Sequence, residues 1–284
     1  MRYDIAIIGT GPAGLEAAIT AKIRNKSILL LGSRSLKKIR KAPKVMNYLG
    51  LPEITGEELA KSFISHIDKM GITITEERAS LVYPMGDYFS IQTAENGTIY
   101  EANAVILATG MVQEKSLEGE NDFLGRGVSY CATCDGGFFK GKRIAVIADS
   151  RDKEKEVDFL AELADDVMYF PQYGDELNVN AKVQVLREKP VAVKGGMKVS
   201  GLQTDKAEYD VDGVFILRDS IAPSKLVPGL EIRDNHVAVN HDMETNIPGC
   251  FAAGDIAGAP YQYIKAAGQG NIAALSAIRY LSHS

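Results

Sequence analysis

The fold of the first part of the chain is decided by the stretch Ile5-Ala6-Ile7-Ile8-Gly9-Thr10-Gly11-Pro12-Ala13-Gly14. Its first four residues form a short β-branched run that is typical of a buried parallel strand. Residues 15–24 are rich in alanine and contain no glycine, which favours a helix, and residues 27–31 supply a second apolar run. The sequence therefore predicts a βαβ unit with a glycine-rich turn after its first strand.

Three glycines of this turn have the spacing of a dinucleotide-binding site. Gly9 permits the tight turn, Gly11 lets the backbone approach a pyrophosphate, and Gly14 lets the helix pack closely on the strand. The free N–H groups at the start of the helix suit a phosphate. Because a strand precedes the glycines and a helix follows them, dinucleotide binding is favoured over a merely structural glycine turn.

Composition sets the broad class of the protein. The chain has 284 residues, with 32 Lys and Arg against 37 Asp and Glu, so its formal net charge is −5. This charge argues against a general binder of nucleic acid or of an anionic membrane. A hydrophobic fraction of 45% and a charged fraction of 24% are those of a globular protein, and the length allows two medium domains.

Cysteine usage and the N-terminal residues indicate a compartment. Three cysteines in this length cannot build a disulfide-dense secreted scaffold, and they suit a reducing compartment. The apolar run Ile5–Ile8 is ended by Gly9, too early for a signal peptide, and no later run has the length of a membrane span. We therefore expect a cytoplasmic protein.

The βαβ pattern occurs a second time. An extended region at 72–110, with a hairpin signal at Asn96-Gly97, separates the first copy from strand, helix and strand patterns at 143–148, 153–163 and 166–170. Residues 211–217 resemble a closing strand. In this copy the turn is Ala148-Asp149-Ser150-Arg151-Asp152-Lys153, which has no glycine and carries two acids that would repel a pyrophosphate.

Two further segments carry chemistry. Cys131-Ala132-Thr133-Cys134 has the spacing of a disulfide closed across one helical turn, and a helix N-terminus lowers the pKa of a thiol. Zinc is the competing use, but only Cys250 and four scattered histidines remain as ligands. Near the C-terminus, a strand ending in Gly254-Asp255 can place a carboxylate on a sugar or ribityl hydroxyl, or the acid can belong to a surface turn.

Together these motifs are similar to those of the low-molecular-weight thioredoxin reductases, and the resemblance covers essentially the whole chain in the same order. The matching segments are Gly9 to Gly14, Ala108-Thr109-Gly110, Gly127 to Gly136, and Thr245 to Asp255. The resemblance implies an α/β fold of two Rossmann-like (three-layer ββα) domains, usually in a homodimer. Residues 1–112 and 244–284 would form the FAD-binding domain, and residues 113–243, carrying the redox disulfide, would be inserted into it.

The resemblance also implies residue roles. Cys134 would face the flavin, Cys131 would attack the disulfide of thioredoxin, and Asp135 would manage the thiol proton. Asp255 would contact the ribityl chain of FAD, and Gln262 with Tyr263 would lie at the pyrimidine edge of the flavin. The remaining expected FAD contacts are Gly9, Gly11, Pro12, Ala13, Gly14, Ser33, Asn47, Ala108, Thr109, Gly110 and Gly254.

This sequence departs from the family pattern at the expected sites of both nucleotides, NADPH and FAD. Members that use NADPH have a second glycine-rich turn, which is lost at 148–153, and a His-Arg-Arg triplet that holds the 2′-phosphate, where this chain has Pro171-Gln172-Tyr173. On the FAD side, the acid that usually binds the adenosine ribose is absent because Gly32-Ser33 follows Leu31, and a Gly-Gly-Gln segment is missing. We expect FAD but no NADPH.

Within the family, the pattern resembles the ferredoxin-dependent flavin thioredoxin reductases, in which reduced ferredoxin is the donor and thioredoxin the acceptor. A flavin can take electrons singly and release a pair, so it can join an iron–sulfur donor to a disulfide. A flavin dithiol oxidase that passes electrons to oxygen is the alternative within the enzyme class. A flavin-binding regulatory or sensor protein is the alternative outside it.

Basic residues gather after the second strand, at Arg34, Lys37, Lys38, Arg40, Lys41 and Lys44, with no acid among them. This loop could steer an acidic ferredoxin, could bind the FAD pyrophosphate, or could simply be solvated. Cys250, on an apolar strand, is interpreted as a buried and inert thiol.

Overall fold

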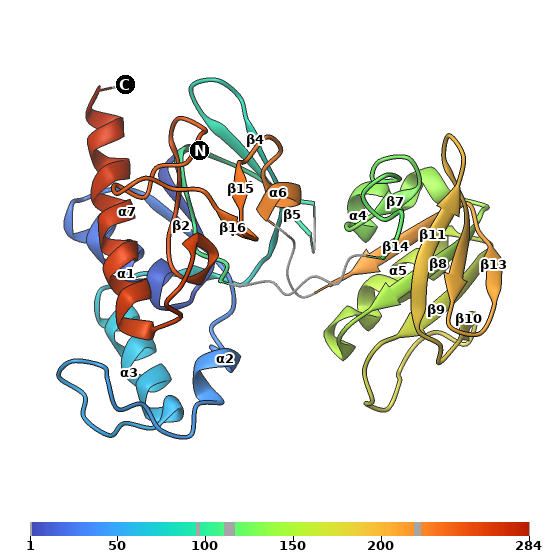
Figure 1. The fold of residues 1–284 in the computed structure, drawn as a ribbon, viewed down its shortest axis with the longest axis horizontal. Helices are drawn as coiled ribbons and strands as arrows, with labels where there is room; N and C mark the ends of the chain where they lie inside the picture. The colour runs from blue at the N-terminus through green and yellow to red at the C-terminus, as the bar shows by residue number, and fades with distance from the viewer. Residues whose placement is uncertain (1, 95–96, 111–116, 219–222, 284) are drawn as a thin grey trace. The chain divides into compact units, whose positions relative to one another are not determined.

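The computed structural model describes residues 2–94, 97–110, 117–218 and 223–283, which form two compact units (Figure 1). The first unit contains residues 2–93, 98–110 and 223–283. The second unit contains residues 117–218 together with residues 94 and 97. Both units are Rossmann-like α/β domains, and the chain leaves the first, builds the second and returns.

The return to the first unit comes earlier than we expected. Residues 223–243, which we assigned to the inserted domain, belong to the first unit. Met243 is buried in the hydrophobic core of that unit, and its carbonyl accepts a hydrogen bond from Ala252 N. Apolar contacts of this kind fix the segment in the first unit, whereas its sequence is too irregular to reveal them.

The first unit is built on one mixed sheet, in which the longest strand has both parallel and antiparallel neighbours. The strand order is β3-β2-β1-β6-β5-β4, and β17 also pairs with β6. The second half of β6 lies parallel to β1 and β17, while its first half pairs antiparallel with β5. The strands are β1 (Arg2–Ile8), β2 (Ile28–Leu31), β3 (Ile74–Thr75), β4 (Ala79–Pro84), β5 (Phe89–Thr93), β6 (Ile99–Leu107) and β17 (Cys250–Ala252).

Helices α1 and α7 lie side by side in the first unit (Figure 1). A Cβ on Gly270 would stand 2.0 Å from the Ala13 carbonyl oxygen, so the absence of a side chain there permits the close approach. The helices and short elements are α1 (Pro12–Ile23), α2 (Lys37–Arg40), α3 (Gly56–Lys69), α6 (Pro223–Leu226), β15 (Ile232–Arg233), β16 (His236–Val237), η3 (Asp255–Ala257) and α7 (Tyr263–His283).

The second unit repeats the design with a parallel sheet in the order β10-β9-β8-β14-β7 and an antiparallel sheet in the order β11-β12-β13. Apolar side chains fill the space between the sheets, and α5 covers the other face of the parallel sheet. The elements are β7 (Val128–Ser129), α4 (Ala132–Asp135), η1 (Gly136–Phe139), β8 (Arg143–Ala148), η2 (Arg151–Lys153), α5 (Glu154–Leu163), β9 (Asp166–Pro171), β10 (Val183–Val185), β11 (Pro190–Gly195), β12 (Val199–Thr204), β13 (Glu208–Asp210) and β14 (Gly213–Leu217).

The expected elements agree closely with the observed ones. Both βαβ openings occur where the sequence predicts them, as do the strands on either side of the expected hairpin at 89–101. Asn96 of that turn lies outside the described residues. Helix α3 was not predicted, although Thr55 and Glu58 form a capping box at its start. Within the described parts of the chain, no helix is long and apolar enough to cross a membrane.

Candidate functional site

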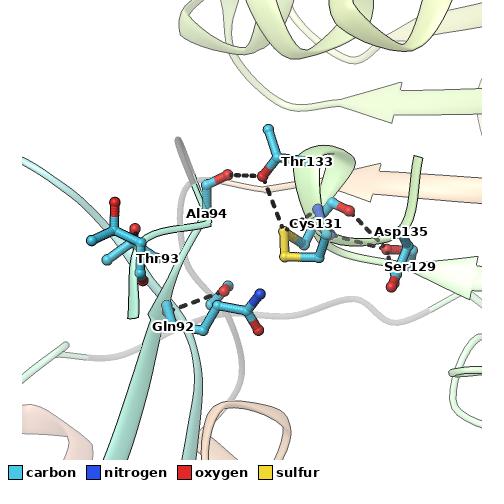
Figure 2. Close-up of a disulfide and its surroundings, with 10 residues drawn as sticks. Gln92, Thr93, Ala94, Ser129, Cys131, Thr133 and Asp135 are labelled. Atoms are coloured by element: carbon cyan, nitrogen blue, oxygen red, sulfur yellow. Dashed lines mark hydrogen bonds between the residues drawn. A yellow bond between two sulfur atoms is a disulfide. The ribbon is translucent and has the colours of Figure 1, made fainter. Parts of the chain in front are cut away.

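The cysteine pair lies in the second unit, at the point where strand β7 gives way to helix α4. Cys131 and Cys134 form a disulfide with a Cα–Cα distance of 5.3 Å. Cys131 is the N-cap of α4, and its sulfur accepts a hydrogen bond from the Cys134 amide at 3.2 Å. Because the helix begins between the two cysteines, its first turn holds both sulfurs at bonding distance (Figure 2).

Asp135 is tied to the same turn through Ser129. The Ser129 hydroxyl donates to the Asp135 carboxylate at 2.7 Å and accepts from the Cys131 amide at 3.1 Å (Figure 2). Ser129 is buried at the end of β7. The carboxylate therefore stays beside the helix that carries the thiols, and the backbone of Cys131 is fixed through the same hydroxyl.

A second carboxylate holds the residue just before Cys131. Glu120 is fully buried, and it accepts hydrogen bonds from the Tyr130 hydroxyl at 2.8 Å and from the Leu117 amide at 2.8 Å. Arg218 donates to both carboxylate oxygens of Glu120, at 2.7 and 2.9 Å. The two residues that precede Cys131 are thus each held by a carboxylate, one from Asp135 and one from Glu120.

The glycine turn of the first unit is packed tightly against strand β6. Gly9 has a φ of +113°, and a Cβ on it would stand 2.2 Å from the Ala108 carbonyl oxygen. A Cβ on Gly14 would stand 1.8 Å from the Gly9 carbonyl oxygen. A side chain at either glycine would force the backbone to move. This close packing of the turn is what the spacing of the glycines predicts.

The start of α1 has the features of a nucleotide phosphate site. No side chain caps this helix, no acid lies in its first turn, and Pro12 stands at its first positions. The space where a Gly11 side chain would extend is empty to 4 Å. Thr109 follows β6, and its amide nitrogen would stand 3.0 Å from a Cβ on Gly9 of the same turn. Its hydroxyl is buried without a hydrogen-bond partner. An uncapped helix end, open space and an unsatisfied hydroxyl fit a bound dinucleotide.

The other half of the FAD site is expected around Gly254 and Asp255. A Cβ on Gly254 would stand 3.0 Å from the Ala13 Cβ, so this loop lies directly on the start of α1. Burial raises the pKa of Asp255, and the nearby cations Lys265 and Lys38 oppose that rise. Lys265 donates to the carbonyl oxygens of Gly254 and Gly258 and so fixes the loop.

The expected flavin-edge residues lie together. Asn47 Nδ2 donates to Gln262 Oε1 at 2.5 Å, which joins the loop after α2 to the residue just before α7. Tyr263 begins α7, and burial, with a smaller contribution from Asp255, raises the pKa of its hydroxyl. Gly110 follows Thr109 in the left-handed region, with a φ of +73°.

At the end of β2, where the adenosine end of FAD is expected and the usual acid is absent, a carboxylate is supplied by the residue that follows β3. Strand β3 pairs with β2, and the Gly32 amide donates to the Thr75 carbonyl at 3.1 Å. The next residue, Glu76, accepts from the Arg34 amide at 2.9 Å. The Ser33 carbonyl accepts from the Thr10 hydroxyl of the glycine turn at 2.7 Å. An exposed carboxylate is therefore present at this edge of the sheet.

The corresponding turn of the second unit is filled by its own side chains. The Tyr173 hydroxyl donates to Glu154 at 2.7 Å, and the Tyr169 and Tyr173 hydroxyls lie 2.7 Å apart. Glu154 is buried at the start of α5. Burial raises the pKa of both tyrosines, to about 12 for Tyr169. A carboxylate thus occupies the helix start that would meet a nucleotide phosphate.

Known proteins place this arrangement in a family. The sequence model that describes the pyridine nucleotide-disulphide oxidoreductase family matches residues 3–148 and 169–270 of this chain. The chain belongs to this family. Members of the family bind flavin and act on a disulfide, so the chain is an oxidoreductase that acts on a disulfide. The residues of the first unit fit FAD, whose flavin would supply one-electron and two-electron transfer when bound.

The expected relation to thioredoxin reductases is confirmed. The thioredoxin reductase of Aquifex aeolicus is 32% identical, with 99% of this chain and 94% of the relative covered. The solved ferredoxin-flavin thioredoxin reductase of Clostridium acetobutylicum is 50% identical, with a TM-score of 0.90 and coverage of 100% of this chain and 98% of that chain. A thioredoxin reductase of Gloeobacter violaceus has a TM-score of 0.81 at 28% identity, with 99% and 95% covered. These matches confirm the expected pair of Rossmann-like domains.

Sequence reasoning missed the residues that hold the site residues in place. Ser129, Glu120 and Tyr130 gave no signal of their own, because their role depends on partners that only the fold brings near. Glu76 could have been noticed, since it directly follows the short strand that pairs with β2. No cluster of three or more potential metal ligands occurs in the described ranges.

Proposed function

We propose that this protein reduces the disulfide of a thioredoxin through Cys131 and Cys134, with electrons that come from a reduced ferredoxin through FAD rather than from NADPH. The observation that carries the proposal is a contrast between two turns. The first-unit turn is open at Gly11 and its helix has no acid in the first turn, whereas Glu154 and Tyr173 fill the second-unit turn. The redox disulfide lies in the second unit, the same unit that contains the filled turn.

The proposed thiol chemistry gives the two sulfurs the roles that the family resemblance implies. Two electrons and two protons convert the Cys131–Cys134 disulfide to two thiols. The Cys131 thiolate then attacks the thioredoxin disulfide, forming a mixed disulfide and releasing one thioredoxin thiol. The Cys134 thiolate attacks Cys131, which restores the internal disulfide and releases the second thioredoxin thiol. Cys131 is 7% exposed here, so its reaction with a protein requires a rearrangement that uncovers the sulfur.

Asp135 serves as the proton-handling group in this proposal. Its carboxylate follows Cys134 directly in α4 and is held by the Ser129 hydroxyl. A carboxylate fixed this close to the pair can accept a thiol proton when the thiolate forms and return it to the leaving thiol.

Two features of the second unit argue against NADPH as the donor. A nucleotide pyrophosphate at the start of α5 would meet the buried Glu154 carboxylate, and like charges repel. The guanidinium groups that would bind a 2′-phosphate are replaced by Gln172 and Tyr173, and Tyr173 instead hydrogen-bonds Glu154.

A ferredoxin donor is supported by likeness and by energetics. The Clostridium acetobutylicum structure, 50% identical to this chain, is that of a ferredoxin-flavin thioredoxin reductase. A plant-type ferredoxin at about −400 mV lies below thioredoxin at about −270 mV. The difference drives transfer of two electrons by roughly 6 kcal/mol.

An anaerobic titration tests the donor. The FAD-loaded protein is mixed first with NADPH and then with reduced ferredoxin, and the flavin absorbance is recorded. We expect bleaching by ferredoxin alone, followed by the appearance of thiols on added oxidised thioredoxin. Rapid bleaching by NADPH would overturn the proposal, and oxygen uptake driven by a dithiol without any ferredoxin would favour a dithiol oxidase.

A further inference from the structure

Lys265, in the first turn of α7, brings a positive charge to the turn that carries Asp255. The residue is partly buried, and its ammonium group donates hydrogen bonds to the Gly254 carbonyl at 3.0 Å and to the Gly258 carbonyl. Gly254 and Gly258 stand on either side of η3, which begins with Asp255. One side chain therefore holds both ends of the turn that presents this carboxylate.

The hydrogen bonds of Lys265 orient its charge without neutralising it. Both acceptors are backbone carbonyl oxygens, which carry no net charge and favour the charged form of an amine. Burial lowers the pKa of Lys265, and the Asp255 carboxylate opposes that shift from a distance. Lys265 is therefore a fixed ammonium group whose field extends into its surroundings.

The surroundings of Asp255 are positively charged from several sides. Burial raises the pKa of this carboxyl, and three side chains from three different elements act against the rise: Lys265 of α7, Lys38 of α2 and His236 of β16. Strand β16 packs against η3, and His236 Nε2 lies 2.8 Å from the Tyr261 hydroxyl. A ligand that gains negative charge beside Asp255 would be stabilised by this field.

The same lysine adjoins both sets of residues expected to contact the flavin half of FAD. Its acceptor Gly254 directly precedes Asp255, the residue expected at the ribityl chain. Tyr263, expected at the flavin edge, lies two residues before Lys265 in α7. Burial raises the pKa of the Tyr263 hydroxyl, and Asp255 adds to the rise, so these two expected contacts lie within electrostatic reach of each other.

We propose that Lys265 is the cation that favours the reduced form of FAD in this site, so that the bound flavin accepts electrons more readily. This inference rests on the proposed function, because it needs FAD at this site. Two electrons and one proton convert oxidised flavin to a reduced form with one more negative charge, and a fixed cation stabilises that added charge. Reduced ferredoxin supplies the electrons in the proposed reaction.

A purely structural role for Lys265 predicts a different result. If the lysine only holds the turn, its loss weakens the binding of oxidised and reduced FAD equally, and the reduction potential of bound FAD does not change. If its charge acts on the flavin, reduced FAD loses more affinity than oxidised FAD. The potential of the bound flavin then becomes more negative by the ratio of the two losses.

The test is an anaerobic titration of the FAD-loaded protein with dithionite in the presence of a reference dye. We expect Lys265→Met and Lys265→Gln to weaken reduced FAD about tenfold relative to oxidised FAD, which is about 30 mV for two electrons. Gln keeps an N–H donor for the carbonyls, so a shift in both variants isolates the charge, and Lys265→Arg should stay close to the wild type. The matched control is Lys206→Met in the second unit, an exposed lysine that also donates to a backbone carbonyl, that of Arg187 at 3.3 Å. It should leave the potential unchanged.

The outcomes separate the role of Lys265 from the proposed function. An unchanged potential in both neutral variants, with or without weaker FAD binding, would make Lys265 a support of the turn alone and overturn the inference. If Lys265→Met takes up no FAD, the Gln and Arg variants decide between charge and support. If dithionite reduces the wild-type flavin and ferredoxin does not, the proposed function fails, while the potentials of the variants still decide on Lys265. A wild type that binds no FAD overturns both.

Discussion

Glu120 and Arg218 form a bidentate ion pair in which the carboxylate is fully buried and also accepts from Tyr130, the residue before Cys131. Arg218 directly follows β14, and β7, which ends one residue before Tyr130, pairs with β14 in register. The pair therefore joins two neighbouring strand ends at the point from which the redox helix starts. It holds in place the backbone that leads into the disulfide.

Removing one partner of this pair should strongly destabilise the second unit. Glu120→Ala leaves Arg218 and the Tyr130 hydroxyl without their shared acceptor, so we expect the free energy of unfolding to fall by about 3–5 kcal/mol. Urea unfolding followed by circular dichroism measures the change.

A double substitution separates the charge from the packing. Glu120→Leu with Arg218→Met replaces both charges by apolar groups, and it should cost clearly less than Glu120→Ala. An equal or larger cost for the double variant would mean that the hydrogen bonds to Leu117 and Tyr130 matter more than the ion pair.

Glu76 should contribute to the affinity for FAD at its adenosine end. A hydrogen bond from a ribose hydroxyl to a carboxylate is strong, so Glu76→Gln should weaken FAD binding about 10- to 100-fold. FMN lacks the adenosine half, and its affinity should not change. Fluorescence titration of the apoprotein with each flavin measures both constants.

The control for Glu76 tests whether a change in the loop, rather than loss of the carboxylate, is responsible for weaker FAD binding. Gln at position 76 keeps an acceptor for the Arg34 amide, and Asp68→Asn removes the ion pair of the Arg34 side chain instead. We expect little effect of Asp68→Asn, because exposed pairs are worth at most about 1 kcal/mol. Equal weakening of FAD and FMN by Glu76→Gln would contradict a ribose contact.

The sequence was sufficient for the elements whose signals are local. The β-branched run and glycine turn at residues 5–14 predict β1 and the start of α1, because both depend on neighbours a few residues away. The place of residues 223–243 was not predictable in this way. It depends on Met243 reaching the core of the first unit, a contact between distant segments.

The same distinction between local signals and distant contacts applies to the residues of the candidate site. The cysteine pair and the glycines could be named because their spacing carries the chemistry. Ser129 and Glu120 could not, since a lone serine or glutamate gains its role from a partner that the fold supplies. The basic segment was visible as composition, but only the structure separates Arg40, which pairs with Glu57, from the exposed Lys41.

Single cysteine variants should show which sulfur meets thioredoxin. If Cys131 attacks, Cys134→Ser leaves no resolving thiol, and a mixed disulfide between Cys131 and thioredoxin should accumulate. Cys131→Ser should accumulate none. Non-reducing gel electrophoresis after mixing with oxidised thioredoxin detects the adduct, and trapping by Cys131→Ser in place of Cys134→Ser would exchange the two roles.

Cys250 should be silent in the native protein. It is fully buried on β17, and burial raises the pKa of its thiol to about 12, while the Thr245 side chain opposes the rise. Both features suppress the thiolate. The reduced native protein should therefore react with iodoacetamide at two of its three cysteines, and at the third only in denaturant. Mass spectrometry of the alkylated peptides gives the sites, and rapid native labelling of Cys250 would contradict its burial.

The same thiol makes stability depend on alkaline pH. Its pKa in the folded state lies above the ordinary value of 9.0, so the stabilisation from keeping it neutral is complete below about pH 9 and is lost as pH rises towards about 12. Between pH 9 and 11 this one group should lower the free energy of unfolding by roughly 2 kcal/mol. Tyr169 and other groups also titrate in this range, so the measurement is the difference in urea stability between wild type and Cys250→Ala at each pH. The advantage of the wild type should shrink as pH rises, and a constant difference would show that the thiol does not titrate in the unfolded chain alone.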